Sequence, residues 1–295
     1  MSVTINFSNM APPNIVEKLD YEAILAEMKE AFVALSPDYS ALLESDPVIK
    51  LLEVCAYREL IIRQRVNDGG KAVMLAHSTG TDLDNLAALF GISRLLVDAG
   101  DLEAVPPVQP TYEDDANLRK RTQLSLEGIT TAGSSGSYVF HTLSASGLVK
   151  DVDIYSPAPG QVTVTVLSTQ GDGVPDQELL DVVTAALNHE DVRPLTDQLT
   201  VLPATIITYT VGAVLEVGEG PDAELIRQEA QTAITAYVAD VHSLGKKVAL
   251  SGIYAALHVA GVDRVTISQP VADIEPGTQQ AAFCSSIEVT LDGGL

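Results

Sequence analysis

Few residue groups in this sequence have the types and spacing that chemistry requires. The tightest set of possible metal ligands is His189-Glu190-Asp191, but no second histidine stands three or four residues away, as a helical zinc site needs. Gly133-Ser-Ser-Gly136 is one residue shorter than a nucleophile elbow. Gly171-Asp-Gly173 lacks the third glycine of a dinucleotide-binding turn. The sequence therefore indicates no metal, no cofactor and no catalytic residue.

Paired acidic residues add little to this search. Neither Asp82-Leu-Asp84 nor Asp151-Val-Asp153 continues as a calcium-binding loop. Among 40 acidic residues, some pair of carboxylates could resemble a glycosidase site by chance. The chain also has no tryptophan to form a sugar-binding platform. We therefore expect a protein that is not an enzyme and takes no small-molecule substrate, with a cell-wall glycan hydrolase as a distant alternative.

Composition limits the possible partners. The 295 residues carry a net charge of −23, which would repel nucleic-acid phosphates and an anionic membrane surface, so neither is expected as a partner. Hydrophobic residues make up 46% of the chain, enough for an aliphatic core. Cys55 and Cys284 are too few and too distant for a disulfide framework, and we expect both to be buried thiols in a reducing compartment. The first residues lack a secretory signal pattern, which predicts a cytoplasmic site of synthesis.

The N-terminal part, residues 1–91, is expected to be an arm (residues 1–14) followed by helices. Apolar spacing predicts helices over 20–35, 47–67, 71–77 and 81–90, with Asp68-Gly69-Gly70 ending the long second one. The expected apolar face of that helix consists of Val48, Leu51, Leu52, Cys55, Ile62 and Val66.

Charged residues interrupt that apolar face. Glu59 and Arg63 stand four residues apart in the order that favours an ion pair, and Arg58 precedes them. One interpretation is the solvated edge of an amphipathic helix. The other is a polar contact that selects a neighbouring helix, including one from another chain, and it makes Arg58, Glu59 and Arg63 candidate protein-interface residues.

The remaining chain alternates strand and helix patterns. Residues 92–160 are expected to hold a linker, helices and a connecting strand, followed by a first α+β module over 161–204 and a second over 205–295. The helix-opening sequences 171–179 and 218–225 resemble each other, which suggests a repeat. The expected fold class is α+β, with an N-terminal helical region and two small tandem α+β modules that resemble ferredoxin-like halves.

As a whole, the chain resembles the baseplate J-like family of contractile-tailed bacteriophages. The resemblance covers nearly the full length and depends on the order and spacing of segments that are weak one by one. These segments are residues 51–59, 63–67, 74–87, 118–121, 131–134, 157–162, 171–173 and 191–197, together with Gly91.

This resemblance implies a structural role. Proteins of the family form baseplate wedges, in which two copies pair, bind a second wedge protein through their N-terminal helices and join neighbouring wedges into a ring. The expected location is the virion tail baseplate, assembled in the host cytoplasm. An equivalent wedge subunit of a tailocin or of a bacterial contractile injection system is the alternative, and the sequence does not separate the two. The resemblance supplies no catalytic residue.

Overall fold

The structure is a computed structural model that describes residues 7, 10, 11, 13, 16–37, 43–129, 133–218 and 223–292. The chain divides into two compact units, one ending at Ser93 and the other running from Arg94 to Leu295. Most of the expected N-terminal arm lies outside the described residues. No helix in the described ranges combines the length and the apolarity needed to cross a bilayer.

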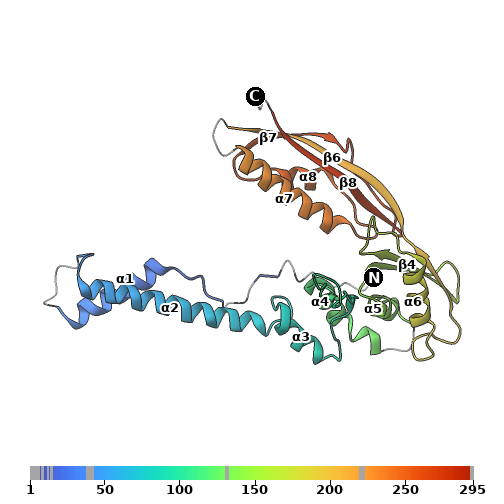
Figure 1. Ribbon diagram of the computed structural model, residues 1–295, viewed down its shortest axis with the longest axis horizontal. Helices are drawn as coiled ribbons and strands as arrows, with labels where there is room; N and C mark the ends of the chain where they lie inside the picture. Colours follow the sequence, from blue (N-terminus) through green and yellow to red (C-terminus); the bar gives the residue numbers. More distant parts are fainter. Residues whose placement is uncertain are drawn as a thin grey trace. The chain divides into compact units, whose positions relative to one another are not determined.

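The first unit is a helical pair with a short third helix (Figure 1). It contains α1 (Tyr21–Leu35), α2 (Pro47–Ala72) and α3 (Gly80–Ala88). Asp20 caps α1 by accepting hydrogen bonds from the amides of Glu22 and Ala23, and Asp46 caps α2 directly before Pro47. These local signals explain why both helices begin where the sequence predicts.

The second unit begins with a hairpin and a central module. The hairpin pairs β1 (Leu96–Asp98) antiparallel with β2 (Thr111–Tyr112). The central module then contains α4 (Asp115–Leu124), a 3₁₀ turn (Glu127–Ile129), α5 (Ser135–Ala145), β3 (Val149–Tyr155), β4 (Gln161–Ser168), α6 (Gln177–Leu187) and β5 (Gln198–Pro203).

The central sheet has the order β3-β4-β5, with β3 antiparallel and β5 parallel to β4. Helix α5 packs on β3 and α6 on β5, and Tyr138, Val164 and Val183 lie in their common core. The Tyr138 hydroxyl donates a 2.8 Å hydrogen bond to Oδ2 of Asp197, the last residue of the turn over 191–197. Burial and then this hydrogen bond raise the pKa of the Tyr138 phenol. The turn therefore closes one end of the core.

The C-terminal module contains β6 (Thr205–Val217), α7 (Ala223–Val241), α8 (Leu250–Leu257), β7 (Val262–Gln269) and β8 (Gln280–Leu291). Its sheet has the order β7-β6-β8, with β7 antiparallel and β8 parallel to β6. Helix α7 packs against β8 and β6, and its buried Ala230 and Ile234 belong to the same core as Leu215.

The structure confirms the α+β class and corrects several details. The strand β8 was not predicted. Strands 198–202 and 262–269, which the suggested repeat treats as equivalent, pair in opposite senses, because β8 and not β7 occupies the parallel position beside β6. Strand β3, expected in a connecting region, belongs to the central sheet. Residues 219–222 of the repeated helix-opening sequence lie outside the described residues.

Three predictions for the helical unit are also wrong. Helix α2 continues through Asp68-Gly69-Gly70 to Ala72, and no helix follows over 71–77. The cost of the glycines, about 1 kcal/mol each relative to alanine, is offset by tertiary bonds from Asn67, in the turn before them. Its Oδ1 accepts from the Glu17 amide at 3.0 Å and its Nδ2 donates to the Glu17 carbonyl at 2.9 Å. Cys55 is exposed, not buried, because it lies on the side of α2 that faces away from α1.

Polar contacts join the central and C-terminal modules, and we call this region the module seam. One Asp151 carboxylate oxygen accepts from Lys120 Nζ at 2.8 Å, and the other accepts from the Leu244 amide at 3.1 Å. Beside it, Lys150 Nζ lies 3.1 Å from His242 Nδ1. Gly173 has a φ of 101°, and a side chain there would collide with Leu167 and the His242 ring. The glycine of the 171–173 segment thus lets a loop of one module touch the next.

Acid is expected to destabilise this seam through His242. Burial and then the Lys150 ammonium lower the pKa of the His242 imidazole. The unfolded chain therefore takes up this proton below about pH 6.5 while the folded chain resists it, so stability present at pH 7 is lost as pH falls. We expect His242→Asn to remove up to about 2 kcal/mol of the loss in unfolding free energy between pH 7 and pH 5 in denaturant titrations. An equal loss in both proteins would contradict this prediction.

Candidate protein interaction surfaces

The core between α1 and α2 is small. Its buried residues are Ile24, Leu25 and Ala56, with Tyr21, Met28, Leu52 and Leu60 packed partly buried around them. A core of this size supplies little of the stabilisation that a folded unit needs, because burial contributes about 25 cal/mol for each Å² of apolar surface. The outer surface of the helical unit therefore becomes the place to look for additional burial.

Helix α2 carries a second apolar row that faces away from α1. We call this row the outward stripe, and it consists of Leu51, Cys55, Ile62 and Val66. The spacing places the stripe roughly a third of a turn from the buried Ile49 and Ala56. Ile62 remains 62% exposed, whereas Ala56 is fully buried. Much of the apolar face predicted from the sequence is thus the side that α1 leaves uncovered.

The three candidate interface residues lie on and beside the outward stripe. Arg58 is exposed and stands between Cys55 and Ile62 in the row. Glu59 and Arg63 form the predicted pair, with Arg63 donating to Glu59 Oε1 at 2.9 and 2.6 Å. This hydrogen bond raises the pKa of the Arg63 guanidinium. The structure therefore joins two of the three candidates to each other and leaves Arg58 among apolar neighbours.

A groove lies along another side of α2. It has a volume of about 530 Å³, and we call it the α1–α2 groove because it lies between α2 and Leu19, just before α1. Its lining includes Leu19, Tyr57, Leu60, Ile61, Gln64 and Arg65. Asp68 also lines the groove and accepts a 2.6 Å hydrogen bond from Gln64 Nε2. The arrangement offers an apolar floor with one cationic and one acidic side chain, which suits a protein segment better than a small polar substrate.

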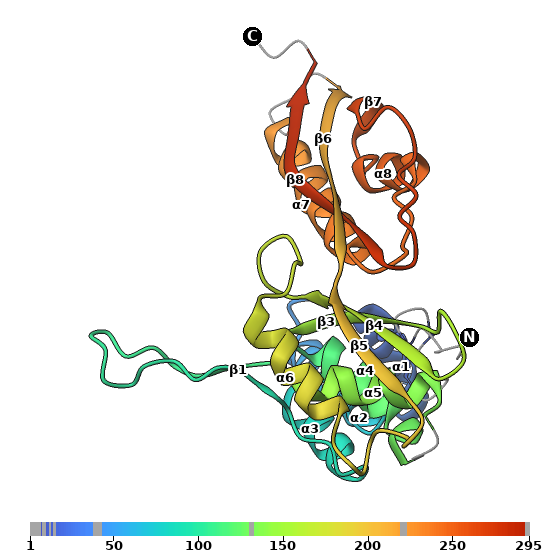
Figure 2. The same cartoon turned by 90° about the vertical axis from the view of Figure 1, so that its right-hand side faces the viewer.

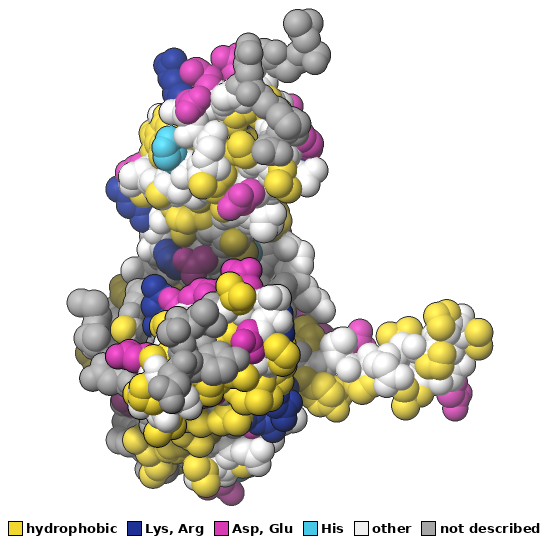
Figure 3. Space-filling view, turned by 90° about the vertical axis from the view of Figure 1, so that its left-hand side faces the viewer, with side chains coloured by type: hydrophobic (Ala, Val, Ile, Leu, Met, Phe, Trp, Pro, Cys, Tyr) yellow, Lys and Arg dark blue, Asp and Glu magenta, His cyan; other side chains and the backbone are white. Residues whose placement is uncertain are grey.

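The hairpin over residues 96–112 is a third exposed surface. We call it the arm from here on, and it is distinct from the N-terminal arm expected over residues 1–14. It extends away from the central module (Figure 2). Hydrophobic side chains cover much of its end (Figure 3). Val105 at the tip is 98% exposed, and Leu102, Val108 and Tyr112 are each more than half exposed. The composition of residues 92–112 predicts a linker or loop. Nothing in the order of its turn residues predicts the ordered hairpin that the structure shows.

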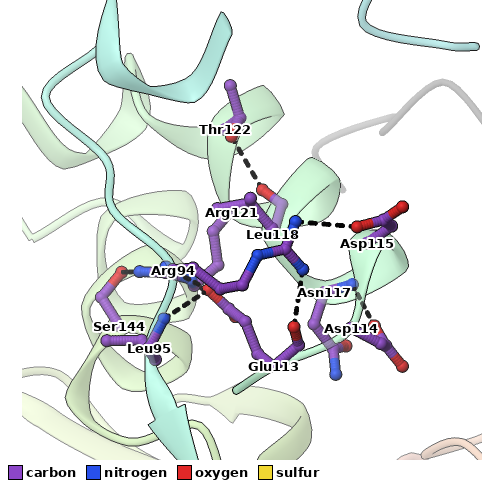
Figure 4. A network of polar contacts seen from close by, with 10 residues as sticks. All are labelled: Arg94, Leu95, Glu113, Asp114, Asp115, Asn117, Leu118, Arg121, Thr122 and Ser144. Carbon is purple, nitrogen blue, oxygen red and sulfur yellow. Dashed lines mark hydrogen bonds and ion pairs between the residues drawn. The ribbon is translucent and has the colours of Figure 1, made fainter. Parts of the chain in front are cut away.

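A buried polar network holds the base of the arm (Figure 4). Arg121 from α4 donates to both carboxylate oxygens of Glu113, at 2.5 and 3.1 Å, and both residues are 4% exposed. Glu113 Oε1 also accepts from the Leu95 amide at 3.0 Å. Arg94 bridges the Glu113 carbonyl and Asp115 Oδ1, at 2.7 Å each. Both strands of the arm are therefore tied to α4 at their root.

The candidates for chemistry remain apart. His189 lies 3.4 Å from Asp191 in an exposed turn, and the described ranges contain no group of three or more metal-binding side chains. Ser134 caps α5, where its side chain accepts from the Ser137 amide. Asp151 and Asp153 both lie on β3. Asp151 contributes to the module seam, where its carboxylate accepts from Lys120 and from the Leu244 amide. The described residues instead bring together exposed apolar surfaces, which are the outward stripe, the groove beside α2 and the tip of the arm.

Comparison with known proteins gives a consistent result. Three family models match successive parts of the chain: the Baseplate J-like N-terminal domain over residues 44–101, the central domain over 130–203 and the C-terminal domain over 209–290. The chain is 44% identical over 296 residues to "Baseplate protein J" of Escherichia phage P2, covering 98% of both sequences. It is also similar to a chain of the anti-feeding prophage baseplate, with 11% identity and a TM-score of 0.28 over 90% of this chain and about half (53%) of that one.

Proposed function

Because the chain belongs to the baseplate J-like family, we propose that it is a structural protein of a phage tail baseplate. In this role two copies pair within a wedge, bind a second wedge protein and join neighbouring wedges around the tail tube. The protein performs no chemical reaction, and its binding energy serves assembly.

The observation that carries this proposal is the outward stripe. A helical unit that buries Ile24, Leu25 and Ala56 but exposes a comparable set of large apolar residues about a third of a turn further around α2 has an incomplete core. Exposed apolar rows on helices mark protein interaction sites, and a helix pair with a free row becomes a bundle when partner helices cover it. The 44% identical baseplate protein of phage P2 supplies the context for those partners.

Arg58, Glu59 and Arg63 give this surface its specificity in our proposal. A guanidinium in the middle of an apolar row favours a partner helix that presents a carboxylate there, and it disfavours partners that do not. The Glu59–Arg63 pair beside it fixes the position of two more charges at the edge of the contact.

The direct test is reconstitution with the neighbouring tail proteins. Co-expression of the full chain with the products of adjacent tail genes should yield a complex containing paired copies, and mass photometry and cryo-electron microscopy should show closed rings. A chain that remains monomeric in the presence of every tail protein would refute the proposal.

Charge reversal at the stripe is expected to separate folding from assembly. Arg58→Glu and Glu59→Lys should each leave the melting temperature of the isolated protein within a few degrees of wild type, because surface ion pairs contribute at most about 1 kcal/mol. Both should abolish co-purification with the wedge partner. Lys50→Glu, at an exposed position near the start of α2, is the matched control and should co-purify normally. Normal co-purification of Arg58→Glu would show that the stripe is not the contact.

A further inference from the structure

The arm is an ordered element whose tip is exposed, with Val105 98% accessible. Asp101 and Val108 exchange backbone hydrogen bonds of 3.0 and 2.8 Å, and the Asp101 side chain accepts from the Glu103 and Ala104 amides. Gly100 has a φ of 65°, and a side chain there would collide with the Val108 carbonyl. An isolated two-stranded hairpin is at best marginally stable in water. The turn chemistry and the buried network at its root therefore maintain an extended shape that gains little from its own packing.

The chemistry of the arm restricts what can bind it. Its tip presents Leu102, Val105 and Val108, and ten residues of extended chain reach about 30 Å from the root. No lysine or arginine occurs in the sequence between Arg94 and Arg119. Asp98 and Asp101 are used in turn hydrogen bonds, which leaves the Glu103 carboxylate exposed and available. The matching surface must therefore be apolar with a free cation beside it.

Another copy of this chain carries such a surface. Within the part of the chain that the structure describes, the guanidinium groups of Arg58 and Arg65 pair with no carboxylate, whereas Arg63, Arg227, Arg264, Lys246 and Lys247 all do. Arg65 lines the α1–α2 groove, whose floor is formed by Leu19, Leu60 and Ile61. Asp68 lines the same groove, but its Oδ1 accepts from Gln64 Nε2, so the Arg65 guanidinium is the charged group left to meet an acidic arm. In a protein with a net charge of −23, most of the surface would repel such an arm.

We propose that the arm of one copy inserts into the α1–α2 groove of a neighbouring copy. The apolar tip fills the groove, and Glu103 pairs with Arg65. This contact is heterologous, because the two copies contribute different surfaces, so each copy offers both a free arm and a free groove. Repetition of the contact closes a ring when the rotation between copies permits it, whereas contact through the outward stripe can complete a pair. The inference rests on the proposed assembly role and assigns its ring-forming contact.

The test uses disulfide trapping between two populations of the full chain. Both carry Cys55→Ser; one carries Val105→Cys in the arm and the other Ile61→Cys in the groove. After mixing under mild oxidation, we expect a mixed dimer at about ten times the yield obtained when the groove cysteine is replaced by Ser251→Cys, an exposed position on α8. Equal yields, or no mixed dimer, would overturn the proposal. A bond formed inside a single chain that carries both cysteines, in place of the mixed dimer, would also overturn it.

A charge swap tests the predicted pair while the two cysteine positions stay the same. Arg65→Glu in the groove chain should reduce the trapped yield about tenfold, and Glu103→Lys in the arm chain should restore it. Neither charge change lies in the outward stripe, and all these chains share Cys55→Ser, so pairing and co-purification with the wedge partner should match those of the chains without a charge change. Absence of the mixed dimer between the Val105→Cys and Ile61→Cys chains, with pairing intact, would reject only the arm contact, whereas absence of pairing in the wild type would reject the proposed function. Failure of Glu103→Lys to restore the yield would contradict the assigned pair.

Discussion

Arg121→Met is expected to lower the unfolding free energy of the second unit by about 3–5 kcal/mol. The substitution keeps an unbranched, apolar side chain but removes the guanidinium cation that faces Glu113. The Glu113 side chain is only 2% exposed, so its carboxylate would remain charged and unpaired in a site that water does not reach. Denaturant titration followed by circular dichroism should show the loss, and hydrogen exchange should show faster exchange in the arm over 96–112.

Two further variants define the origin of this loss. Arg264→Met removes one side of an exposed pair with Glu216, where the arginine side chain is 68% exposed, and should cost less than about 1 kcal/mol. The double variant Glu113→Gln/Arg121→Met removes both charges but keeps an oxygen that can accept from the Leu95 amide. It should recover about 2 kcal/mol of the loss. If the double variant is as unstable as Arg121→Met alone, packing and not the unpaired charge is responsible.

The buried polar network at the base of the arm could not be predicted from the sequence. Arg119-Lys120-Arg121 looks like a surface cluster of basic residues, yet Arg121 is buried against Glu113 and Lys120 bonds Asp151 at the module seam. Both carboxylate partners are supplied by the fold and not by neighbours on the same helix. Spacing along one helix therefore predicts exposed pairs such as Glu59–Arg63 and misses pairs made across elements.

Local patterns were sufficient for most helices and strands. Strand β6 and strand β7 have the bounds predicted from their β-branched residues, and α6 begins after Asp176, whose side chain accepts from the Leu179 amide. Strand β8 was missed because its segment mixes small and polar residues, and its pairing with β6 is fixed by partners about 75 residues away in the chain. The two modules differ in whether particular strands pair parallel or antiparallel. This depends on residues far apart in the chain, so the spacing of hydrophobic residues within one strand does not predict it.

The face of α2 illustrates a different limit. The sequence correctly marks Leu51, Cys55, Ile62 and Val66 as an apolar row, but the same row could be a core or an interface. The side of α2 that α1 covers is decided by tertiary contacts. One example is the pair of hydrogen bonds between Asn67, near the end of α2, and the backbone of Glu17, just before α1. The hydrophobic pattern therefore predicts an apolar row, and only the tertiary structure shows that α1 leaves this row exposed.

Ile62→Asp should consequently abolish assembly while leaving the isolated chain folded. In the free protein the aspartate is solvated, since Ile62 is 62% exposed, so the change in unfolding free energy should stay within about 0.5 kcal/mol. In the assembled bundle the same carboxylate would be buried without a partner, at a cost of several kcal/mol, which corresponds to a loss of affinity of at least a hundredfold. Copies that associate in mass photometry, and wedge partners that co-purify, should both be lost.

Ala56→Asp provides the matched comparison on the face of the same helix that α1 covers. Ala56 is fully buried against α1, so this aspartate disrupts the helical unit itself and should melt α1 and α2 in the isolated chain. Ala56→Asp is thus expected to unfold the helical unit even without a partner, whereas Ile62→Asp is expected to act only when a partner binds. If Ile62→Asp assembled normally, the outward stripe would be an ordinary solvent-exposed face, and the incomplete core of the helical unit would have to be completed elsewhere, with α3 and its exposed Leu89 and Phe90 as the next surface to test.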